Sequence, residues 1–237
     1  MKGITVNPHD EPTGTHDFDH AYWEGHWAEG RTAERDAGQD LPVSPYLPAE
    51  AGALAPGTAL DAGCGVGTEA LWLAGQGWQV TGADLSATAL AQAAGRARTA
   101  GLQDRVDWVE ADLTRWEPGR TWDLVTTHYA HPDSGQLSFY ALLGGLVAPA
   151  GTLLIVGHRH GAHGGHSGHG AHGAQGGHGE AGGPGHPEGS TASLEGITGL
   201  FAGPAWTVEA AYENERSLHR DGRDLTLQDV VVRVRRS

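Results

Sequence analysis

Cysteine is nearly absent from this sequence, because Cys64 is the one cysteine in 237 residues. A lone thiol cannot form an internal disulfide, which removes the usual indication of a secreted protein. Long apolar runs are also missing, since the longest, around Leu153 to Val156, is far too short to span a bilayer. The opening segment MKGITVNPHDEP lacks the apolar centre of a signal peptide. These absences predict a soluble, cytoplasmic protein with no membrane partner.

Basic residues are scarce, with 15 Lys and Arg against 29 Asp and Glu, which gives a formal net charge of −14. Such a charge repels the phosphate backbone of a nucleic acid, so nucleic-acid partners are disfavoured. The 15 histidines make this charge sensitive to pH just below neutrality. The chain length suits one sizeable domain, and we predict a single domain over residues 1–237.

Short apolar runs alternate with helical stretches from Thr58 onward, as in a parallel sheet with crossover helices. Near the C-terminus two β-rich runs, Trp206 to Tyr212 and Leu225 to Val234, flank a polar loop and predict an antiparallel pair. The pattern therefore predicts a doubly wound α/β fold. The other expected strands are Thr58–Ala62, Gln79–Asp84, Val106–Glu110, Trp122–His128 and Gly151–Gly157.

Besides a helix directly after Gly67, four helices are predicted from apolar spacing and from residues typical of helix ends. An aromatic helix begins near Asp19, and a short helix follows Pro45. The best-marked helix runs from Ala87 to about Ala100, with Ser86 as its N-cap and Gly101 at its end. The fourth spans Gln136 to about Val147, where Pro149 is expected to stop it.

Two segments are too polar to fold on their own, residues 1–17 and residues 158–189. We expect the first to be a flexible arm and the second to be a disordered insert. The insert contains eight histidines on a glycine-rich backbone, and neutral imidazole binds nickel, copper, zinc and cobalt. Weak binding of divalent metal ions by this insert is one hypothesis, and low-complexity drift is the alternative. No defined metal site is predicted.

A glycine-rich turn is the most informative motif of the chain, in the segment TALDAGCGVGTEALWLA from Thr58 to Ala74. Glycines at Gly63, Gly65 and Gly67 allow a tight turn and a close approach of the backbone to a ligand. A dinucleotide-binding turn has a different third spacing, at which this chain carries threonine. The carboxylate of Asp61, just before the turn, suits a cationic amine better than a pyrophosphate. Cys64 is expected to be a small turn residue.

Two further acids end the next two strands. Asp84, followed by Leu85, stands where ribose-binding folds place an acid that accepts hydrogen bonds from both sugar hydroxyls. Asp112, followed by Leu113, closes the third strand, where a carboxylate can accept a hydrogen bond from the amine of an adenine. Together with Asp61, these acids predict a ligand with an ammonium group, a ribose and an aminopurine. Each acid taken alone is more typical of a solvated strand end.

On these residues the chain resembles the class I methyltransferases that use S-adenosylmethionine (SAM). The resemblance runs from about Asp19 to the C-terminus, without the histidine-rich insert. It implies that DAGCGVG is the SAM loop, and that the sheet has the order 3-2-1-4-5-7-6 with the seventh strand antiparallel. The aromatic segment with Trp23 and Trp27 is similar to the N-terminal helix of thiopurine and tellurite-resistance methyltransferases, which covers the cofactor. Plain core packing of these two tryptophans is the alternative.

Transfer of a methyl group from a sulfonium needs mainly alignment and exclusion of water. In this family the substrate faces the end of the fourth strand, where His128, Tyr129 and His131 lie in this sequence. His128 is our first candidate for a general base, and the alternative is that His128 or Tyr129 only shapes the pocket wall. We therefore predict methylation of a small molecule. The alternatives are a detoxifying methyltransferase, acting on a thiol or on a tellurium or selenium oxyanion, and a metal-buffering protein on the same scaffold.

Overall fold

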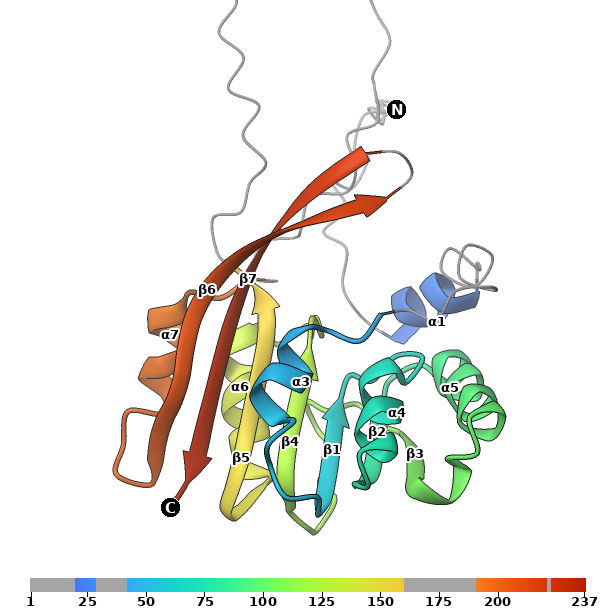
Figure 1. Cartoon of the computed structure of the whole chain (residues 1–237), viewed down its shortest axis with the longest axis horizontal. Helices are drawn as coiled ribbons and strands as arrows, with labels where there is room; N and C mark the ends of the chain where they lie inside the picture. Colours follow the sequence, from blue (N-terminus) through green and yellow to red (C-terminus); the bar gives the residue numbers. More distant parts are fainter. Residues whose placement is uncertain (1–19, 29–41, 160–190, 221–222) are drawn as a thin grey trace, which may run out of the picture.

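A seven-stranded sheet forms the centre of the computed structural model, which describes residues 20–28, 42–159, 191–220 and 223–237. The strand order is β3-β2-β1-β4-β5-β7-β6, in which β7 runs antiparallel to β5 and β6 and the other neighbouring pairs are parallel (Figure 1). This arrangement confirms the predicted fold class and strand order. The strands are β1 (Thr58–Ala62), β2 (Gln79–Asp84), β3 (Val106–Glu110), β4 (Trp122–His128), β5 (Val147–His158), β6 (Trp206–Arg220) and β7 (Arg223–Arg236).

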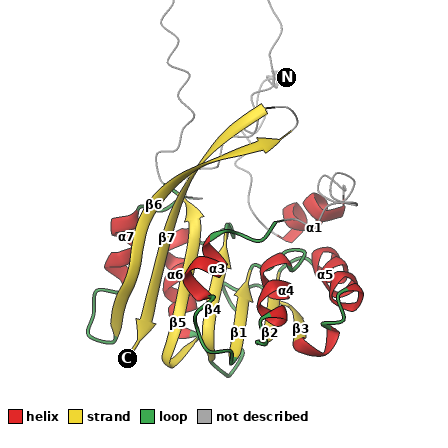
Figure 2. Ribbon diagram, viewed as in Figure 1, coloured by secondary structure: helices red, strands yellow, loops and turns green. Residues whose placement is uncertain are grey.

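Helices cover both faces of the sheet (Figure 2). On one face, α3 and α4 pack over a core that includes Leu73, Leu124 and Val231. On the other face, α6 and α7 bury Leu143 and Ile197 in a second core. The described helices are α1 (His20–Ala28), α3 (Tyr46–Ala51), α4 (Thr68–Gly75), α5 (Ala87–Thr99), α6 (Gln136–Gly145) and α7 (Leu194–Leu200), with a 3-10 turn at Gln103–Arg105.

The helix α5 forms for the reasons that its sequence predicts. The Ser86 side chain accepts a hydrogen bond from the Ala89 backbone N–H at 3.1 Å, a cap that contributes about 1 kcal/mol. Ala89, Ala93 and Ala97 recur every fourth residue and are fully buried. Beyond the helix, Gly101 takes a φ of 70°, which favours glycine. The helix thereby holds the chain segment after Asp84 against the sheet.

The central strand β5 carries a continuous apolar run. Leu153, Leu154, Ile155 and Val156 are all fully buried, because helices cover both faces of this part of the sheet. Burying each such side chain contributes about 1.5–3 kcal/mol before the entropy cost of ordering it. The rigid centre of the sheet fixes the carboxyl ends of β1, β2 and β4, where the candidate site lies.

The boundary between α6 and β5 differs from the prediction. The helix ends at Gly145, and Val147 already pairs with Trp122 in the sheet. Pro149 therefore lies inside β5 rather than stopping a helix. Glycine at Gly144 and Gly145 weakens the helix before the proline is reached, while the β-branched Val147 suits a strand.

The C-terminal hairpin is longer than predicted, since β6 and β7 remain paired from Trp206–Arg236 to Arg220–Arg223. Hydrophobic alternation fades in its outer half, where the strands project beyond the sheet (Figure 1). The helix α7 was not predicted, although Ser193 caps it by accepting a hydrogen bond from the Gly196 N–H at 3.0 Å. A glycine-containing segment of seven residues gives little helical periodicity.

None of the helices in the described ranges is both long and apolar enough to cross a membrane. The predicted arm at residues 1–17 lies outside the described residues. The same holds for the histidine-rich insert, apart from His158 and Arg159 at its start. Both predictions therefore remain predictions.

Candidate active site

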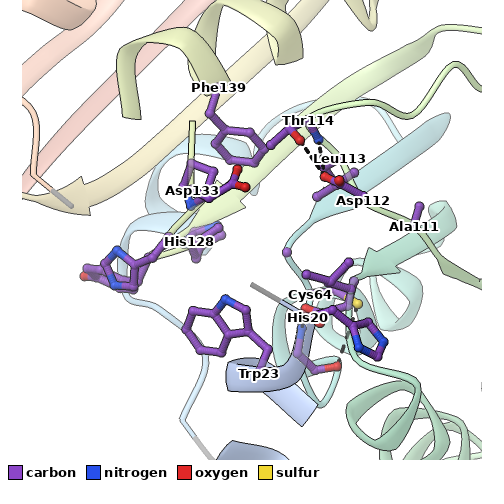
Figure 3. A pocket seen from close by; sticks show the side chains of 18 of the residues that line it. His20, Trp23, Cys64, Ala111, Asp112, Leu113, Thr114, His128, Asp133 and Phe139 are labelled. Carbon is purple, nitrogen blue, oxygen red and sulfur yellow. Dashed lines mark hydrogen bonds between the residues drawn. The ribbon is translucent and has the colours of Figure 1, made fainter. Parts of the chain in front are cut away.

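A cavity of about 630 Å³ opens at the carboxyl ends of the parallel strands. This is the end at which open α/β sheets bind their ligands. In Figure 3, Trp23 of α1 and His128 of β4 lie across the cavity from Asp112 and Thr114. The lining residues are His20, Trp23, Trp27, Gly63, Cys64, Gly65, Val66, Thr68, Glu69, Asp84, Leu85, Ala111, Asp112, Leu113, Thr114, Arg115, His128, Tyr129, Ala130, His131, Pro132, Asp133 and Phe139.

The turn between β1 and α4 needs its glycines for both conformation and space. Gly63, Gly65 and Gly67 have φ values of 75°, 50° and 78°, which L side chains rarely adopt. A Cβ at Gly63 would lie 2.6 Å from the Cβ of Ala130, which faces it from the end of β4. The backbone of this turn therefore forms a cavity wall without side chains at Gly63 and Gly65.

The Asp84 carboxylate anchors the same turn. Its Oδ2 accepts a hydrogen bond from the Gly65 N–H at 2.7 Å, and its Oδ1 accepts one from the Ser86 N–H at 2.9 Å. Burial raises the pKa of Asp84, although these backbone donors oppose the effect. Each carboxylate oxygen has a second lone pair. Asp84 can therefore also accept hydrogen bonds from a ligand in the cavity.

Asp112 lies on the far wall, directly after β3. Its Oδ1 accepts hydrogen bonds from the Thr114 N–H at 3.0 Å and the Thr114 hydroxyl at 2.6 Å, while its Oδ2 lies 3.6 Å from Arg115 Nε. These contacts hold the carboxylate at the cavity edge. Leu113 beside it is partly buried against the sheet core and gives this end of the cavity an apolar surface.

Two residues predicted for the cofactor site do not line the cavity. Asp61 is 1% exposed and lies beneath the turn. Gly67 packs against the Trp108 ring. A Cβ at Gly67 would lie 2.5 Å from that ring, so packing of the turn requires this glycine. The remaining predicted residues, from Trp23 to Tyr129, all lie on the wall.

Cys64 also lines the cavity, but its thiol is buried. Burial raises the pKa of Cys64 well above its usual range, so the side chain stays a neutral thiol. This agrees with the expectation that Cys64 is a small turn residue rather than a nucleophile.

His128, at the end of β4, is a neutral ring. Its Nε2 lies 2.9 Å from the hydroxyl of Thr126, and its Nδ1 is buried with no partner among the described residues. Burial lowers the pKa of His128 to about 3. Such an imidazole is a weak base at neutral pH. The geometry therefore favours a role in shaping the wall over proton transfer.

Tyr129 is held in an unusual conformation by a buried network. Its φ is 55°, which costs a non-glycine residue about 1–2 kcal/mol. Its phenol oxygen accepts a hydrogen bond from Arg216 Nη2 at 3.1 Å. Arg216 Nε in turn donates at 2.6 Å to the fully buried Asp229, which also accepts from the Tyr46 hydroxyl at 2.8 Å. The C-terminal hairpin thus fixes a side chain at the end of β4. Burial also raises the pKa of Tyr129, which keeps its phenol protonated.

Aromatic rings continue this wall toward α1. The His158 ring lies 4.8 Å from that of Tyr129 and stacks at 5.5 Å on His131, which is nearly parallel to Trp23 at 6.4 Å. Gln136 Nε2 donates to the Ala130 carbonyl at 2.8 Å and lies 3.2 Å from His131 Nδ1. The start of α6 therefore orients the His131 ring.

The helix α1 docks against α5 through a carboxylate. Glu24 accepts hydrogen bonds from the Thr88 hydroxyl at 2.7 Å and the Thr88 N–H at 3.2 Å. These bonds and the nearby Ser86 lower the pKa of Glu24 to about 2. On the same helix Trp27 lies against the turn, because a Cβ at Gly65 would be 3.1 Å from its ring. The helix α1 therefore covers one side of the cavity.

Comparisons with known proteins agree with this architecture. A family model described as a methyltransferase domain matches residues 59–151. Residues 59–151 therefore match a methyltransferase domain, and the sheet has the strand order that the resemblance to class I SAM-dependent methyltransferases implies. The turn with Gly63, Gly65 and Gly67 and the strand that ends at Asp84 both lie within the matched part.

Among curated relatives of this chain is ribosomal RNA small subunit methyltransferase C of Alcanivorax borkumensis, which is 34% identical over 110 residues. That match covers 44% of this chain and 33% of the relative. A protein of Arabidopsis thaliana named "Probable thiol methyltransferase 2" is 33% identical over 103 residues, which cover 44% of this chain and 45% of the relative. The chain thus matches less than half the length of either relative.

Among solved structures, TehB from Haemophilus influenzae superposes with a TM-score of 0.63 at 15% identity. The superposition covers 90% of this chain and 67% of TehB. At this identity the likeness concerns the fold alone. Methyltransferases of this class use SAM as the methyl donor.

Several residues of the cavity wall were missed in the sequence. Glu69 lies in the first turn of α4, where a carboxylate is also common for its favourable interaction with the helix dipole. Asp133 follows β4 within a polar loop, and Phe139 lies on a helix whose apolar residues suggest only core packing. Asp133 and Phe139 lie far from the turn in sequence, so no local pattern links them to the cavity.

No group of three or more His, Cys, Asp or Glu side chains in the described part of the chain is arranged to hold a metal ion. The hypothesis of metal binding concerns the insert, which lies outside that part.

Proposed function

We propose that this chain transfers a methyl group from SAM to a small-molecule acceptor, and that it does so within one domain. The observation that carries the proposal is the cavity itself, which joins the glycine turn, Asp84 and Asp112 at one end to Tyr129 and His131 at the other. One wall therefore suits a nucleoside, and the opposite wall leaves room for a second molecule.

The residues of the first wall fit the cofactor. Asp84 has spare lone pairs for the ribose hydroxyls, and Asp112 with Leu113 offers a carboxylate and an apolar surface for the adenine. Gly63 and Gly65 add no side chain of their own to this wall, and the side chains of Ala130 and Trp27 lie against them. Trp23 and Trp27 line the cavity from α1. A cation held over the face of such a ring is stabilised by about 0.5–2 kcal/mol.

When bound, SAM supplies a methyl group on a sulfonium, a leaving group that needs no further activation. The chain's own contribution is then alignment and the exclusion of water. The helix α1 closes one side of the cavity, and Arg216 and Gln136 fix the rings of Tyr129 and His131. We propose that these rings hold the acceptor in line, with no general base at His128.

The acceptor end suits a neutral or soft molecule. Arg115 is the only arginine or lysine among the described lining residues, and it lies beside Asp112 at the other end. Arg216 contacts Tyr129, but it is ion-paired with Asp229 and does not line the cavity, so we favour a thiol over a tellurium oxyanion as the detoxifying substrate. The relative named as a thiol methyltransferase supports this choice. The formal charge of −14 argues against RNA, the substrate that the other relative's name gives.

Thermal unfolding with SAM, S-adenosylhomocysteine, Ni²⁺ and Zn²⁺ tests the function. Binding to the folded chain raises the unfolding temperature, so both sulfur nucleosides are expected to stabilise it. Stabilisation by the metals alone would instead favour a metal-buffering protein. Incubation with methyl-labelled SAM and a panel of thiols, amines and phenols then identifies the acceptor, and the appearance of labelled product is the expected outcome.

A further inference from the structure

Among the described lining residues, Asp133 is the one acid at the acceptor end of the cavity. Figure 3 shows it on the wall, with its carboxylate turned toward the cavity. Within the described part of the chain, this carboxylate takes part in no hydrogen bond or ion pair. Asp133 is therefore free to bind a group that enters the cavity. The other lining acids belong to the glycine turn and to the ends of β2 and β3, namely Glu69, Asp84 and Asp112.

The loop that carries Asp133 is braced at both ends. Tyr129, with a φ of 55°, turns the chain out of β4, and Arg216 holds its phenol. At the other end Gln136, the first residue of α6, is 4% exposed and donates from Nε2 to the Ala130 carbonyl at 2.8 Å. A group on a braced loop loses little freedom when it binds a ligand, which favours affinity. The loop therefore presents the carboxylate in a prepared position.

The arginines near this end of the cavity are engaged elsewhere. Arg115 is the only arginine or lysine among the described lining residues, and its Nε lies 3.6 Å from Asp112 Oδ2. Arg216 contacts Tyr129 but donates at 2.6 Å to the buried Asp229 and does not line the cavity. The formal net charge of −14 also makes the chain as a whole attract cations. A cationic ligand is therefore favoured at this end, and an anionic one is repelled.

Aromatic rings line the same end of the cavity. Tyr129 and His131 precede Asp133 by four and two residues, and Phe139 follows on α6. Trp23 of α1 is nearly parallel to the His131 ring. The faces of aromatic rings attract organic cations, whereas a divalent metal ion needs several ligand atoms, and the described residues offer no such group. A carboxylate in these surroundings suits an organic ammonium group.

We propose that Asp133 binds a protonated amine of the methyl acceptor and thereby selects acceptors that carry a cationic group. The inference rests on the proposed function and adds the charge of the substrate to it. A protonated amine has no free lone pair, so the methyl group goes to another atom of the same molecule. For a thiol, the new sulfur–carbon bond forms as the sulfonium–methyl bond breaks, and the thiol proton passes to solvent.

Three benzenethiols that differ in the charge of the para group test this inference. They are 4-(aminomethyl)benzenethiol, 4-methylbenzenethiol and 4-sulfanylbenzoate. Calorimetric titration of the full chain, saturated with S-adenosylhomocysteine so that no methyl group is transferred, measures the affinity for each. We expect the cationic probe to bind roughly fivefold tighter than the neutral one, about the worth of an exposed ion pair with a cation–π contact. The anionic probe should bind most weakly. Methylation with SAM should follow the same order in kcat/KM.

The variant Asp133→Asn removes the charge and keeps the shape of the side chain. We expect the affinities for the cationic and neutral probes to fall within twofold of each other in this variant. Asp133→Lys should reverse the order, so that 4-sulfanylbenzoate binds most tightly. Asp107→Asn, at an exposed position of β3, is the matched control and should keep the original order. Circular dichroism establishes that each variant is folded.

Different failures have different meanings. If Asp133→Asn slows methylation of all three probes equally, Asp133 acts on the reacting atom or on the loop, and the inference is wrong. It is also wrong if the unmodified chain binds S-adenosylhomocysteine but binds the cationic probe no better than the neutral one, or binds none of the three. If the chain binds neither SAM nor S-adenosylhomocysteine, the proposed function fails, and this inference fails with it.

Discussion

The two walls of the cavity are built in different ways. The cofactor wall comes from β1, β2, β3 and the turns that directly follow them, all within residues 58–115. The acceptor wall combines the end of β4 and the start of α6, and it is supported by Arg216 and Asp229 from the hairpin. The helix α1 borders both walls, with Trp27 against Gly65 and Trp23 beside His131. A wall built from one stretch of sequence can be recognised from a short motif. The shape of a wall built from distant segments can change with the sequence of each segment. The comparison suggests that the first wall sets the cofactor and the second sets the acceptor.

The largest expected effect comes from the cofactor wall. Asp84→Ala should cost about 1.5–3 kcal/mol of SAM binding, because it removes a charged acceptor of hydrogen bonds. Calorimetric titration with SAM measures this loss as roughly a tenfold to hundredfold rise in Kd. Asp107→Ala, at an exposed position of β3, is the control and should leave the affinity unchanged. An unaltered affinity in Asp84→Ala would remove this residue from the cofactor wall.

The second prediction concerns the neutral state of His128. Its pKa of about 3 lies below the ordinary value of 6.5, so the unfolded chain takes up a proton that the folded chain excludes. Stability should therefore fall as the pH is lowered from 6.5 toward 3, by up to about 1.4 kcal/mol per pH unit from this residue. Urea unfolding across this range should show a shallower slope for His128→Gln. A histidine ring that titrates near pH 6.5 and disappears in the variant would contradict the prediction.

The third prediction separates the two walls directly. Arg216→Gln should release the Tyr129 phenol and slow methyl transfer about tenfold, the equivalent of one charge-assisted hydrogen bond. The Kd for SAM should stay within twofold, because Arg216 does not touch the cofactor wall. Kinetics with the acceptor found by the labelled screen, alongside calorimetry, measure both quantities. Arg235→Gln, an exposed residue of the same hairpin, is the control. Parallel loss of SAM affinity would show that the two walls are not independent.

The smallest expected effect involves the contact between α1 and α5. The pKa of Glu24, lowered from 4.5 to about 2, means that its contribution is complete above pH 4.5 and is lost as the pH falls toward 2. The fluorescence of Trp23 and Trp27 should report this undocking. Glu24→Gln should weaken the docking at neutral pH and remove its dependence on acid. An identical acid response in the variant would assign the change to other groups.

Much of the cofactor wall was predictable because local sequence determines it. The bounds of β1 to β4 and the cap at Ser86 were predicted correctly. Asp61 shows the limit of such reasoning, since the motif does not reveal that the side chain is buried beneath the turn while Glu69 faces the cavity. Which of two neighbouring acids faces a ligand depends on how α4 packs on the sheet.

The acceptor wall was only partly predictable. His128 and Tyr129 were identified because they end a strand, but the sequence could not show that burial makes His128 a weak base. The contact of Arg216 with Tyr129 joins residues 87 positions apart, and no local pattern links them. The boundary at Pro149 was wrong because strand pairing of Val147 with Trp122 outweighed the expected helix.

The sequence alone determined the strands, the tight turn and the acids that follow it, because backbone freedom at glycine and apolar periodicity act over a few residues. The tertiary structure decided which side chains face the cavity, which of them are charged, and what holds the ring of Tyr129. These properties depend on burial and on partners that only the folding of distant segments brings together.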